Sequence, residues 1–312
     1  MAKAVFTTRI DPSYDDLPED RYHFPRTYLR QVEAALNDWI VYYEPRRAGG
    51  KSATGGRQAY FATARVTRIE RDPDLEAHFY ARVSDYLEFD RAVSFREGPH
   101  YYEEALRKTD GTTSKGAFGR AVREIGEAEY DEILHAGFAH VLGERERSRP
   151  APDVPEEPLR TNPGLFDPQT PFEDSVSTRP LFTQVSRRPF RERAFSAAVK
   201  SAYLDTCAVT GLKIINGEGR SEVQAAHIRP VADAGPDSVR NGVALSATVH
   251  WMFDRGLISI EDDYRLLLAN GRVPDAMSRM IGPNQLLTVP PRLELRPHRH
   301  FLKYHRDHVF KG

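Results

Sequence analysis

Four polar residues stand at fixed intervals within one stretch of this chain, residues 222–269, and they constrain the fold more than any other feature. Asn241 follows His227 by fourteen positions, His250 follows Asn241 by nine, and Asp254 follows His250 by four. Two histidines, an amide and a carboxylate at such spacing indicate a compact unit that holds polar side chains together.

The residues around these four positions predict a small ββα unit. Alternation and β-branched side chains are typical of a strand, and a run rich in Gly, Pro, Asp and Asn is typical of an ordered loop. Ser is a favoured helix N-cap, and Gly commonly ends a helix. The pattern predicts a strand at 222–231, a loop at 232–242, a short strand at 243–246, a helix from Ala247 that Ser246 caps and Gly256 ends, and a hairpin at 257–269.

The predicted helix brings metal-binding chemistry close to a base. Residues four apart share one face of a helix, so His250 and Asp254 lie together. An imidazole and a carboxylate on that face, opposite His227 on a strand, can hold a divalent cation beside a general base. The alternative for Asp254 is an ordinary pairing with Arg255 or a cap of a neighbouring segment.

This segment resembles HNH endonuclease domains of the restriction type, whose motifs read AHI-x-P, N-G-x-x-L and H-x-x-F-D-x-G-L-I. The likeness extends upstream and to the C-terminus and covers about the last third of the chain. The matching positions are Ala226–Ile228, Asn241-Gly242, Leu245, His250–Ile258, Cys207–Gly211 and 296–310.

The resemblance implies metal-assisted phosphodiester hydrolysis, with His227, Asn241 and His250 as the catalytic set. His227 is then the general base, and His250 with Asp254 binds Mg²⁺ or Mn²⁺. Asn241 orients the strand that carries His227. The chain departs from many such enzymes at Ala226, where an Asp or His often ligates the metal. We therefore expect few protein ligands and more water, which suits Mg²⁺ or Mn²⁺ better than zinc.

Composition limits the remaining possibilities. Hydrophobic residues make up 40% and charged residues 29%, as in globular proteins, and the net charge of −1 restricts any DNA-binding surface to local clusters of basic side chains. A single cysteine, Cys207, excludes an internal disulfide and a four-cysteine zinc ribbon. No apolar run is long enough to span a bilayer and the start is unlike a signal peptide, so we expect a cytoplasmic protein without membrane contact.

The N-terminal part predicts a different architecture, a small β-barrel with flanking helices. Alternating aromatic and apolar residues mark several long strands, and a Gly-rich tip joins the first two as a hairpin. The predicted elements are a helix after Pro25, strands at 38–47, 57–72 and 78–95, the tip at 49–56, and helices within 100–142.

The order of these elements resembles the EVE branch of the PUA-like superfamily, over roughly residues 1–140. The matching positions are Tyr22–Pro25, Asp38–Arg46, Gly56–Val66 and Tyr86–Val93. Fused ahead of an HNH nuclease, such a domain resembles the reader of a modification-dependent, type IV-like restriction endonuclease. The implied chemistry is a pocket for one flipped base, which stacks on aromatic side chains.

Alternation along the strand at 38–44 places Trp39 and Tyr43 on one face, and we predict that they line this pocket with Tyr22 and Phe24 as neighbours. The alternative is that these aromatics form the barrel core. Arg46, Arg47, Lys51 and Arg57 surround the hairpin tip and are candidates for DNA backbone contacts; the alternative is a solvated basic loop.

The predicted fold class is therefore α+β, in three parts. Residues 1–143 form the EVE/PUA-like reader domain, residues 144–189 a linker with nine of the 22 prolines, and residues 190–312 the ββα-metal HNH nuclease domain.

The predicted function is cleavage of double-stranded DNA that carries 5-methylcytosine or 5-hydroxymethylcytosine. We expect a homodimer, since one HNH site cuts one strand. Two alternatives stay open: an HNH endonuclease whose N-terminal domain is directed by unmodified sequence or by RNA, and a modified-nucleic-acid binder with an inert HNH fold.

Overall fold

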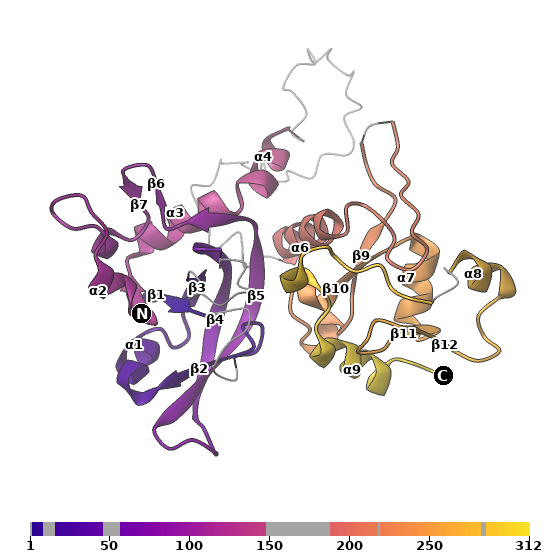
Figure 1. Ribbon diagram of the computed structural model, residues 1–312, viewed down its shortest axis with the longest axis horizontal. Coiled ribbons are helices and arrows are strands. Elements are labelled where there is room, and N and C mark those ends of the chain that lie inside the picture. The colour runs from indigo at the N-terminus through magenta and orange to yellow at the C-terminus, as the bar shows by residue number, and fades with distance from the viewer. Residues whose placement is uncertain (1, 9–15, 46–56, 148–187, 218, 282–284) are drawn as a thin grey trace, which may run out of the picture.

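The computed structural model of the protein describes residues 2–8, 16–45, 57–147, 188–217, 219–281 and 285–312. It is a mixed α+β structure in two halves, with the N-terminal sheet on the left of Figure 1 and the C-terminal unit on the right. The predicted tip at 49–56 and most of the predicted linker at 144–189 lie outside the described residues.

The N-terminal half is built on one sheet of six strands, in the order β2-β5-β4-β3-β1-β8. The sheet curls into a half-barrel (Figure 1), and no ladder among the described residues joins β2 to β8. β1 and β3 are parallel, and every other pair of neighbours is antiparallel. The strands are β1 (Lys3–Thr7), β2 (Arg21–Pro25), β3 (Trp39–Glu44), β4 (Ala59–Arg71), β5 (His78–Ser94) and β8 (Val122–Ile125).

Alternation along β3 divides the buried side chains between two cores. Trp39 and Tyr43 pack with side chains of helices α3 and α4, whereas Ile40 and Tyr42 pack on the other face with side chains of β2 and α1. Period-2 alternation produces this division, since successive side chains of a strand point to opposite faces. The predicted pairing of the strands at 38–47 and 57–72 is confirmed by the β3–β4 ladder.

The helices of this half are α1 (Leu29–Ala34), α2 (Lys115–Phe118), α3 (Glu127–Gly137) and α4 (Ala139–Arg147), with short 3-10 turns η1 (Arg26–Tyr28) and η2 (Glu104–Leu106). Helices were predicted within 100–142, and at the start of this range the prediction was wrong, because a two-stranded ribbon, β6 (Arg96–Glu97) and β7 (His100–Tyr101), and η2 occupy residues 96–106. Glu103 is the reason: its buried carboxylate accepts hydrogen bonds from Arg123 at 2.6 and 2.8 Å and from Tyr60 at 2.6 Å, and these tertiary contacts override helix propensity.

The C-terminal half contains the predicted ββα unit and the hairpin. β9 (Gln224–His227) pairs with β10 (Gly242–Leu245), α7 (Ala247–Asp254) follows, and β11 (Ile258–Ile260) pairs with β12 (Leu266–Leu268). α8 (Asp275–Met280), α9 (Arg299–His308) and 3-10 turns at Val231–Asp233 (η3), Val239–Asn241 (η4) and Leu293–Leu295 (η5) complete it. The helix starts where predicted, but Ser246 does not cap it with its side chain; Glu222 accepts the Ala247 N–H instead, at 2.9 Å.

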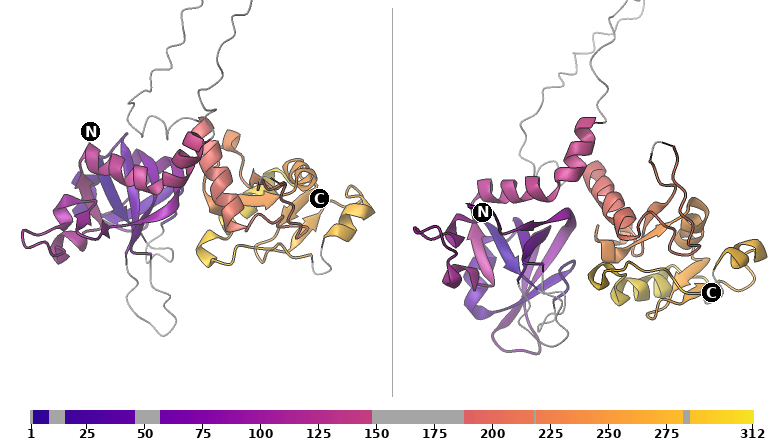
Figure 2. Two further views of the ribbon diagram at one scale, coloured as in Figure 1. Left: turned by 90° about the horizontal axis from the view of Figure 1, so that it is seen from above. Right: turned by 45° about the horizontal axis from the view of Figure 1, so that its top comes forward.

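Helix α6 (Arg188–Ala202) lies between the halves and contributes to both cores (Figure 2). Phe190 and Ala194 pack into the core of the N-terminal sheet, whereas Phe195 and Val199 pack into the core of the ββα unit. The predicted boundary at residue 190 therefore falls inside a helix that both halves use. No helix in the described ranges is long and apolar enough to span a bilayer.

Candidate active site

The predicted catalytic residues all lie on the ββα unit, His227 on β9, Asn241 just before β10 and His250 on α7. The register of the hairpin places His227 opposite Gly242, directly after Asn241, and places Gln224 opposite Leu245, just before α7. Gly242 is required there, because a Cβ would lie 2.4 Å from the Val199 side chain of α6. His227 therefore lies at the end of the hairpin next to the loop. Helix α7, which carries His250, begins at the other end.

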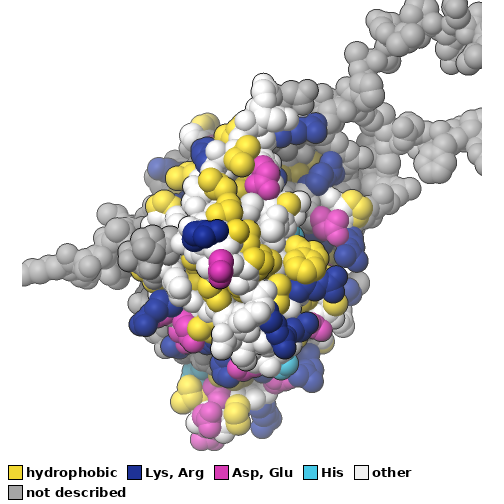
Figure 3. All heavy atoms as spheres, turned by 90° about the vertical axis from the view of Figure 1, so that its right-hand side faces the viewer, with side chains coloured by type: hydrophobic (Ala, Val, Ile, Leu, Met, Phe, Trp, Pro, Cys, Tyr) yellow, Lys and Arg dark blue, Asp and Glu magenta, His cyan; other side chains and the backbone are white. Residues whose placement is uncertain are grey.

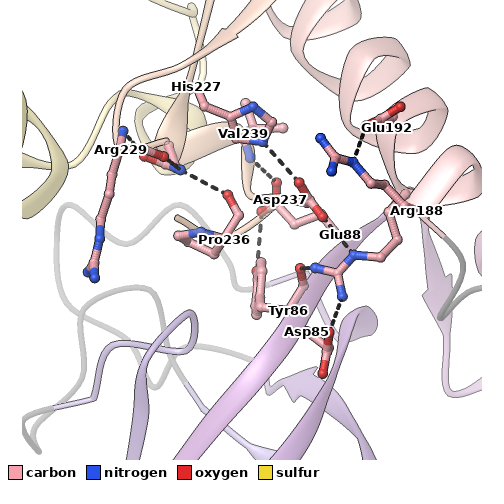
Figure 4. Close-up of polar contacts among 12 residues, drawn as sticks. Asp85, Tyr86, Glu88, Arg188, Glu192, His227, Arg229, Pro236, Asp237 and Val239 are labelled. Atoms are coloured by element: carbon pink, nitrogen blue, oxygen red, sulfur yellow. Dashed lines mark hydrogen bonds and ion pairs between the residues drawn. The ribbon is translucent and has the colours of Figure 1, made fainter. Parts of the chain in front are cut away.

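His227 is held on two sides. Its ring stacks on Phe195 with 3.8 Å between centroids, and its Nε2 lies 2.9 Å from a carboxylate oxygen of Asp237 (Figure 4). Burial alone raises the pKa of Asp237, but the hydrogen bond from His227 and the charge of Arg191 outweigh it, so the pKa is lowered. An ionised carboxylate only accepts, so Nε2–H donates and Nδ1 is left as the proton acceptor.

Asn241 is fully buried and closes the loop that follows β9. Its amide nitrogen donates to the carbonyls of Arg229 at 3.0 Å and Pro236 at 2.9 Å, and its side-chain oxygen accepts from the Arg229 N–H at 2.9 Å. Its backbone carbonyl accepts from Ile228 at 2.9 Å. These bonds fix the chain on the C-terminal side of His227.

His250 is oriented as a metal ligand would be. Its Nδ1 lies 2.8 Å from the side-chain oxygen of Gln224, which can only accept, so Nδ1–H donates and Nε2 keeps its lone pair. Nε2 lies 3.4 Å from a carboxylate oxygen of Asp254, on the same face of α7. A histidine that donates its other N–H to a neighbouring oxygen is the usual arrangement in metal sites.

These residues fit a divalent cation that keeps most of its ligands as water or phosphate oxygen. His250 and Asp254 offer two donors, and within the described residues no cluster of three or more His, Cys, Asp or Glu side chains is placed to bind a metal. Mg²⁺ commonly binds to one or two protein ligands and keeps several waters. The small hydrophobic side chain of Ala226, which is fully buried, adds no donor.

Two residues of the site were missed by sequence reasoning. Asp237 lies in the Gly- and Pro-rich loop, where an aspartate is an ordinary turn residue, and Gln224 is a polar residue on a short strand. Only the fold shows that Asp237 meets His227 and that Gln224 meets His250.

The four aromatics predicted for a base pocket lie on two faces of the N-terminal sheet. Trp39 and Tyr43 belong to one core, and Tyr22 and Phe24 to the other, where their rings stack at 6.1 Å. All four are at most 9% exposed. The guanidinium of Arg123 lies 5.4 Å from the ring centroid of Tyr43.

Of the four basic residues predicted at the hairpin tip, Arg46, Arg47 and Lys51 lie outside the described residues. Arg57 is described and is turned inward. Its Nε lies 3.1 Å from a carboxylate oxygen of buried Glu44, and its guanidinium lies over the Phe61 ring at 4.8 Å. On another face, which Figure 3 shows, Lys and Arg side chains lie around an apolar region of the C-terminal half.

Comparison with known proteins supports the identity of the C-terminal half. Residues 207–261 match the family model described as "HNH endonuclease", so this segment is an HNH endonuclease domain. No curated protein matches the chain.

The structure search found similar solved chains at low identity. The modification-dependent TagI restriction endonuclease is 15% identical, with 98% of this chain and 81% of that chain covered and a TM-score of 0.29. The N-terminal domain of Staphylothermus marinus McrB is 11% identical, covers 43% of this chain and 93% of its own length, and has a TM-score of 0.30. The type IV phosphorothioation-dependent restriction endonuclease ScoMcrA is 12% identical, with 97% and 50% covered and a TM-score of 0.20. Likeness at these TM-scores carries no argument about function.

Proposed function

We propose that the chain is a metal-dependent DNA endonuclease whose N-terminal half reads modified cytosine, in the manner of a type IV-like restriction enzyme. The observation that carries the nuclease part is the placement of His227, Asn241 and His250 on one ββα unit within the HNH segment. The reader part rests on the resemblance of the N-terminal sequence to EVE domains.

In the proposed reaction, His227 is the general base. Its Nδ1 takes a proton from a water molecule while the water oxygen forms a bond to phosphorus, and the bond from phosphorus to the leaving 3′ oxygen breaks. Asp237 accepts a hydrogen bond from Nε2 of His227 at 2.9 Å, so the proton lies on Nε2 and the lone pair of Nδ1 stays available. Asn241 contributes by fixing the loop after β9 rather than by touching the reacting atoms.

His250 and Asp254 are the proposed ligands of Mg²⁺ or Mn²⁺. A cation bound there would stabilise the negative charge on the phosphate and on the leaving oxygen. Gln224 orients His250 for this role through its hydrogen bond to Nδ1, which leaves Nε2 directed at the side of the helix where Asp254 lies.

For the reader, we propose that Trp39 and Tyr43 line the pocket for a flipped 5-methylcytosine or 5-hydroxymethylcytosine. Tyr22 and Phe24, which were expected as their neighbours, lie in the core on the opposite face of the sheet and are left out of this pocket. Two features support Tyr43: its hydroxyl is buried without a hydrogen-bond partner in the described part of the chain, and Phe118 meets its ring edge-on at 5.6 Å. A base that enters there gains both stacking and polar contacts.

We further propose a homodimer on double-stranded DNA, because each HNH site cuts one strand and a double-strand break requires two. Arg46, Arg47, Lys51 and Arg57 are the proposed phosphate contacts of the reader. For Arg57, this role requires that its side chain leave Glu44, to which it is paired in the free protein.

The test is cleavage of matched duplexes that carry cytosine, 5-methylcytosine or 5-hydroxymethylcytosine, with Mg²⁺ or Mn²⁺. We expect cutting of a modified duplex only and its loss when the cation is chelated. His227→Ala should lower the cleavage rate by about 10²–10⁴-fold while binding measured by gel shift persists. His308→Ala, which changes an exposed histidine of α9, is the matched control.

The possible results separate the two parts of the proposal. Equal cutting of all three duplexes would retain the nuclease and reject the modified-base reader, and would favour a reader of unmodified sequence. Binding of modified DNA without cutting under either cation would reject the nuclease in favour of a modified-nucleic-acid binder. Undiminished cutting by His227→Ala would reject the assignment of the base.

A further inference from the structure

We propose that Asp237 is a positioning residue for the His227 imidazole, and that Arg191 and Asp85 extend this support into the N-terminal half. The N-terminal sheet would then help to set the geometry of the nuclease site. This inference rests on the proposed nuclease function, and the experiment below separates the two.

The first step is the contact between Asp237 and His227. The two side chains are 7% and 18% exposed, and the oxygen-to-nitrogen distance is 2.9 Å. The Phe195 ring covers one face of the imidazole, so the ring cannot turn without losing either the stack or the hydrogen bond. A buried, charge-assisted bond of this kind sets both the tautomer and the direction of the free nitrogen.

The second step is the set of hydrogen bonds that the guanidinium of Arg191, on helix α6, donates. Its Nε donates to the second oxygen of Asp237 at 2.7 Å, and one terminal nitrogen donates to Asp85 of β5 at 2.6 Å. The other terminal nitrogen donates to the carbonyl of Tyr86 at 3.3 Å. A guanidinium holds several acceptors in one plane, so Asp237 and β5 are fixed relative to each other.

The third step is the docking of the loop that carries Asp237. β2 pairs with β5 only as far as Arg82, and beyond that point the same edge of β5 meets the loop, with a bridge between Leu87 and Asp237. The Val239 N–H donates to the Glu88 carboxylate at 3.0 Å (Figure 4). The loop is therefore held by the N-terminal sheet on one side of Asp237 and by Asn241 on the other.

Within the described residues, Arg191 and Asp85 contact this assembly directly, and Glu19, Arg57 and Arg240 lie near Glu88. Arg191 is the cation that contacts Asp237, and Asp85 is the anion that shares it. Glu88 is buried nearby, and this burial raises its pKa. The charge next to His227 is thus set chiefly by Asp237 and Arg191.

The experiment compares Asp237→Asn, Asp85→Asn and the double variant with Glu192→Gln, a matched control on α6 whose exposed carboxylate pairs with Arg188. We expect Asp237→Asn to lower kcat by roughly 10–100-fold, as for other residues that orient a catalytic side chain. Asp85→Asn should lower kcat less, and the double variant should be no slower than Asp237→Asn alone. Glu192→Gln should match the wild type.

A second readout needs no catalysis: the tautomer of the His227 ring, read from its ring ¹⁵N chemical shifts by NMR and assigned from the signal lost in His227→Gln. The Asp237 carboxylate accepts the proton of Nε2, so Asp237→Asn should change the balance of the two tautomers, whereas Glu192→Gln should keep that of the wild type. A merely structural role would leave the tautomer unchanged. Arg191→Lys, which cannot span both carboxylates, should behave like Asp85→Asn.

The outcomes are distinguishable. Wild-type cleavage with an unchanged His227 tautomer in Asp237→Asn would overturn the proposal, and additive effects of Asp85→Asn and Asp237→Asn would overturn the link to β5. If the wild type cuts no DNA, the proposed function fails, while the NMR measurement of the tautomer still decides whether Asp237 controls the His227 ring.

Discussion

Three histidines of the C-terminal half occupy different environments, and each environment sets what the ring can do. His227 is partly exposed and held by Asp237, and His250 is partly exposed and held by Gln224. His305 is 2% exposed, stacks on Phe253 at 3.9 Å and contacts the Ser259 hydroxyl at 2.9 Å. Only the first two can reach a substrate, and the third is structural.

His305 gives the nuclease half a predictable dependence on pH. Burial lowers its pKa from 6.5 to about 4, so the unfolded chain binds a proton in this range that the folded chain does not. Stability from this group is fully present above pH 6.5 and is lost as the pH falls towards 4, by roughly 3 kcal/mol in all.

We therefore expect the free energy of unfolding, measured with urea at several pH values, to fall between pH 6.5 and 4.5. His305→Gln should be less stable at neutral pH but flatter across this range, whereas His308→Gln, on the exposed side of the same helix, should keep the wild-type slope. An equal slope in wild type and His305→Gln would contradict the assignment.

At the residue scale, the sequence was informative where chemistry depends on spacing along the chain. His227, Asn241, His250 and Asp254 could be proposed because their intervals match a motif. The role of Asp237 could not be proposed, because its partners are distant in the sequence. Arg191 lies on a separate helix, and Leu87 of β5, which forms a bridge with Asp237, is more than a hundred residues away. Contacts of that range depend on how the two halves pack, which no local pattern records.

At the scale of elements, the alternation of apolar side chains and the positions of turn and cap residues predicted the strands and the ββα unit. The β9–β10 and β11–β12 hairpins, the start of α7 and the β3–β4 pair lie where alternation, Gly and Ser indicated. The strand β8 was missed, because it has only four residues and follows a bend that contains glycines. Its pairing with β1 is what makes it a strand. The curled sheet likewise depends on long-range ladders.

The end of α7 offers a test of a single turn. Gly256 has φ of +72°, and a Cβ there would lie 2.0 Å from the carbonyl oxygen of Val309 in the C-terminal segment. Gly271 has a similar φ of +66° but nothing within 4 Å. Both Gly→Ala changes carry the left-handed penalty of about 1 kcal/mol, and only Gly256→Ala adds a backbone clash, for a further ~1–3 kcal/mol.

We expect Gly256→Ala to lower the urea midpoint clearly more than Gly271→Ala. The reason is that the C-terminal segment must move away from Gly256, whose carbonyl accepts the Lys311 N–H at 3.0 Å. Equal losses in the two variants would show that the C-terminal segment does not pack against this turn.

At the scale of the whole molecule, helix α6 and the loop before Asn241 join the two halves into one body. α6 places Phe190 in one core and Phe195 in the other, so neither half keeps its core if the helix leaves. Sequence patterns suggested two domains and a linker. They did not indicate that the loop before Asn241 docks on the N-terminal sheet, because the acidic residues that hold this loop are scattered in the sequence.

Glu19 is the best probe of this docking. Its carboxylate is 1% exposed, accepts from the Ser238 hydroxyl at 3.1 Å, and pairs with Arg240 at 3.2 Å across the interface. Removal of one partner of a buried pair leaves the other charge uncompensated, at a cost of about 3 kcal/mol. Asp20, next in the chain, pairs with Arg82 within the N-terminal half and is 45% exposed, so its loss costs less than about 1 kcal/mol.

We therefore expect Glu19→Gln to separate the unfolding of the halves, so that calorimetry resolves two transitions where the wild type shows one. Asp20→Asn, which makes the same chemical change one residue away, should retain a single transition close to the wild-type Tm. The effect follows from coupling: two cores that share α6 unfold together only while the interface is stable. A single unshifted transition in Glu19→Gln would mean that α6 alone holds the halves together, and that the Glu19 contacts add little to their docking.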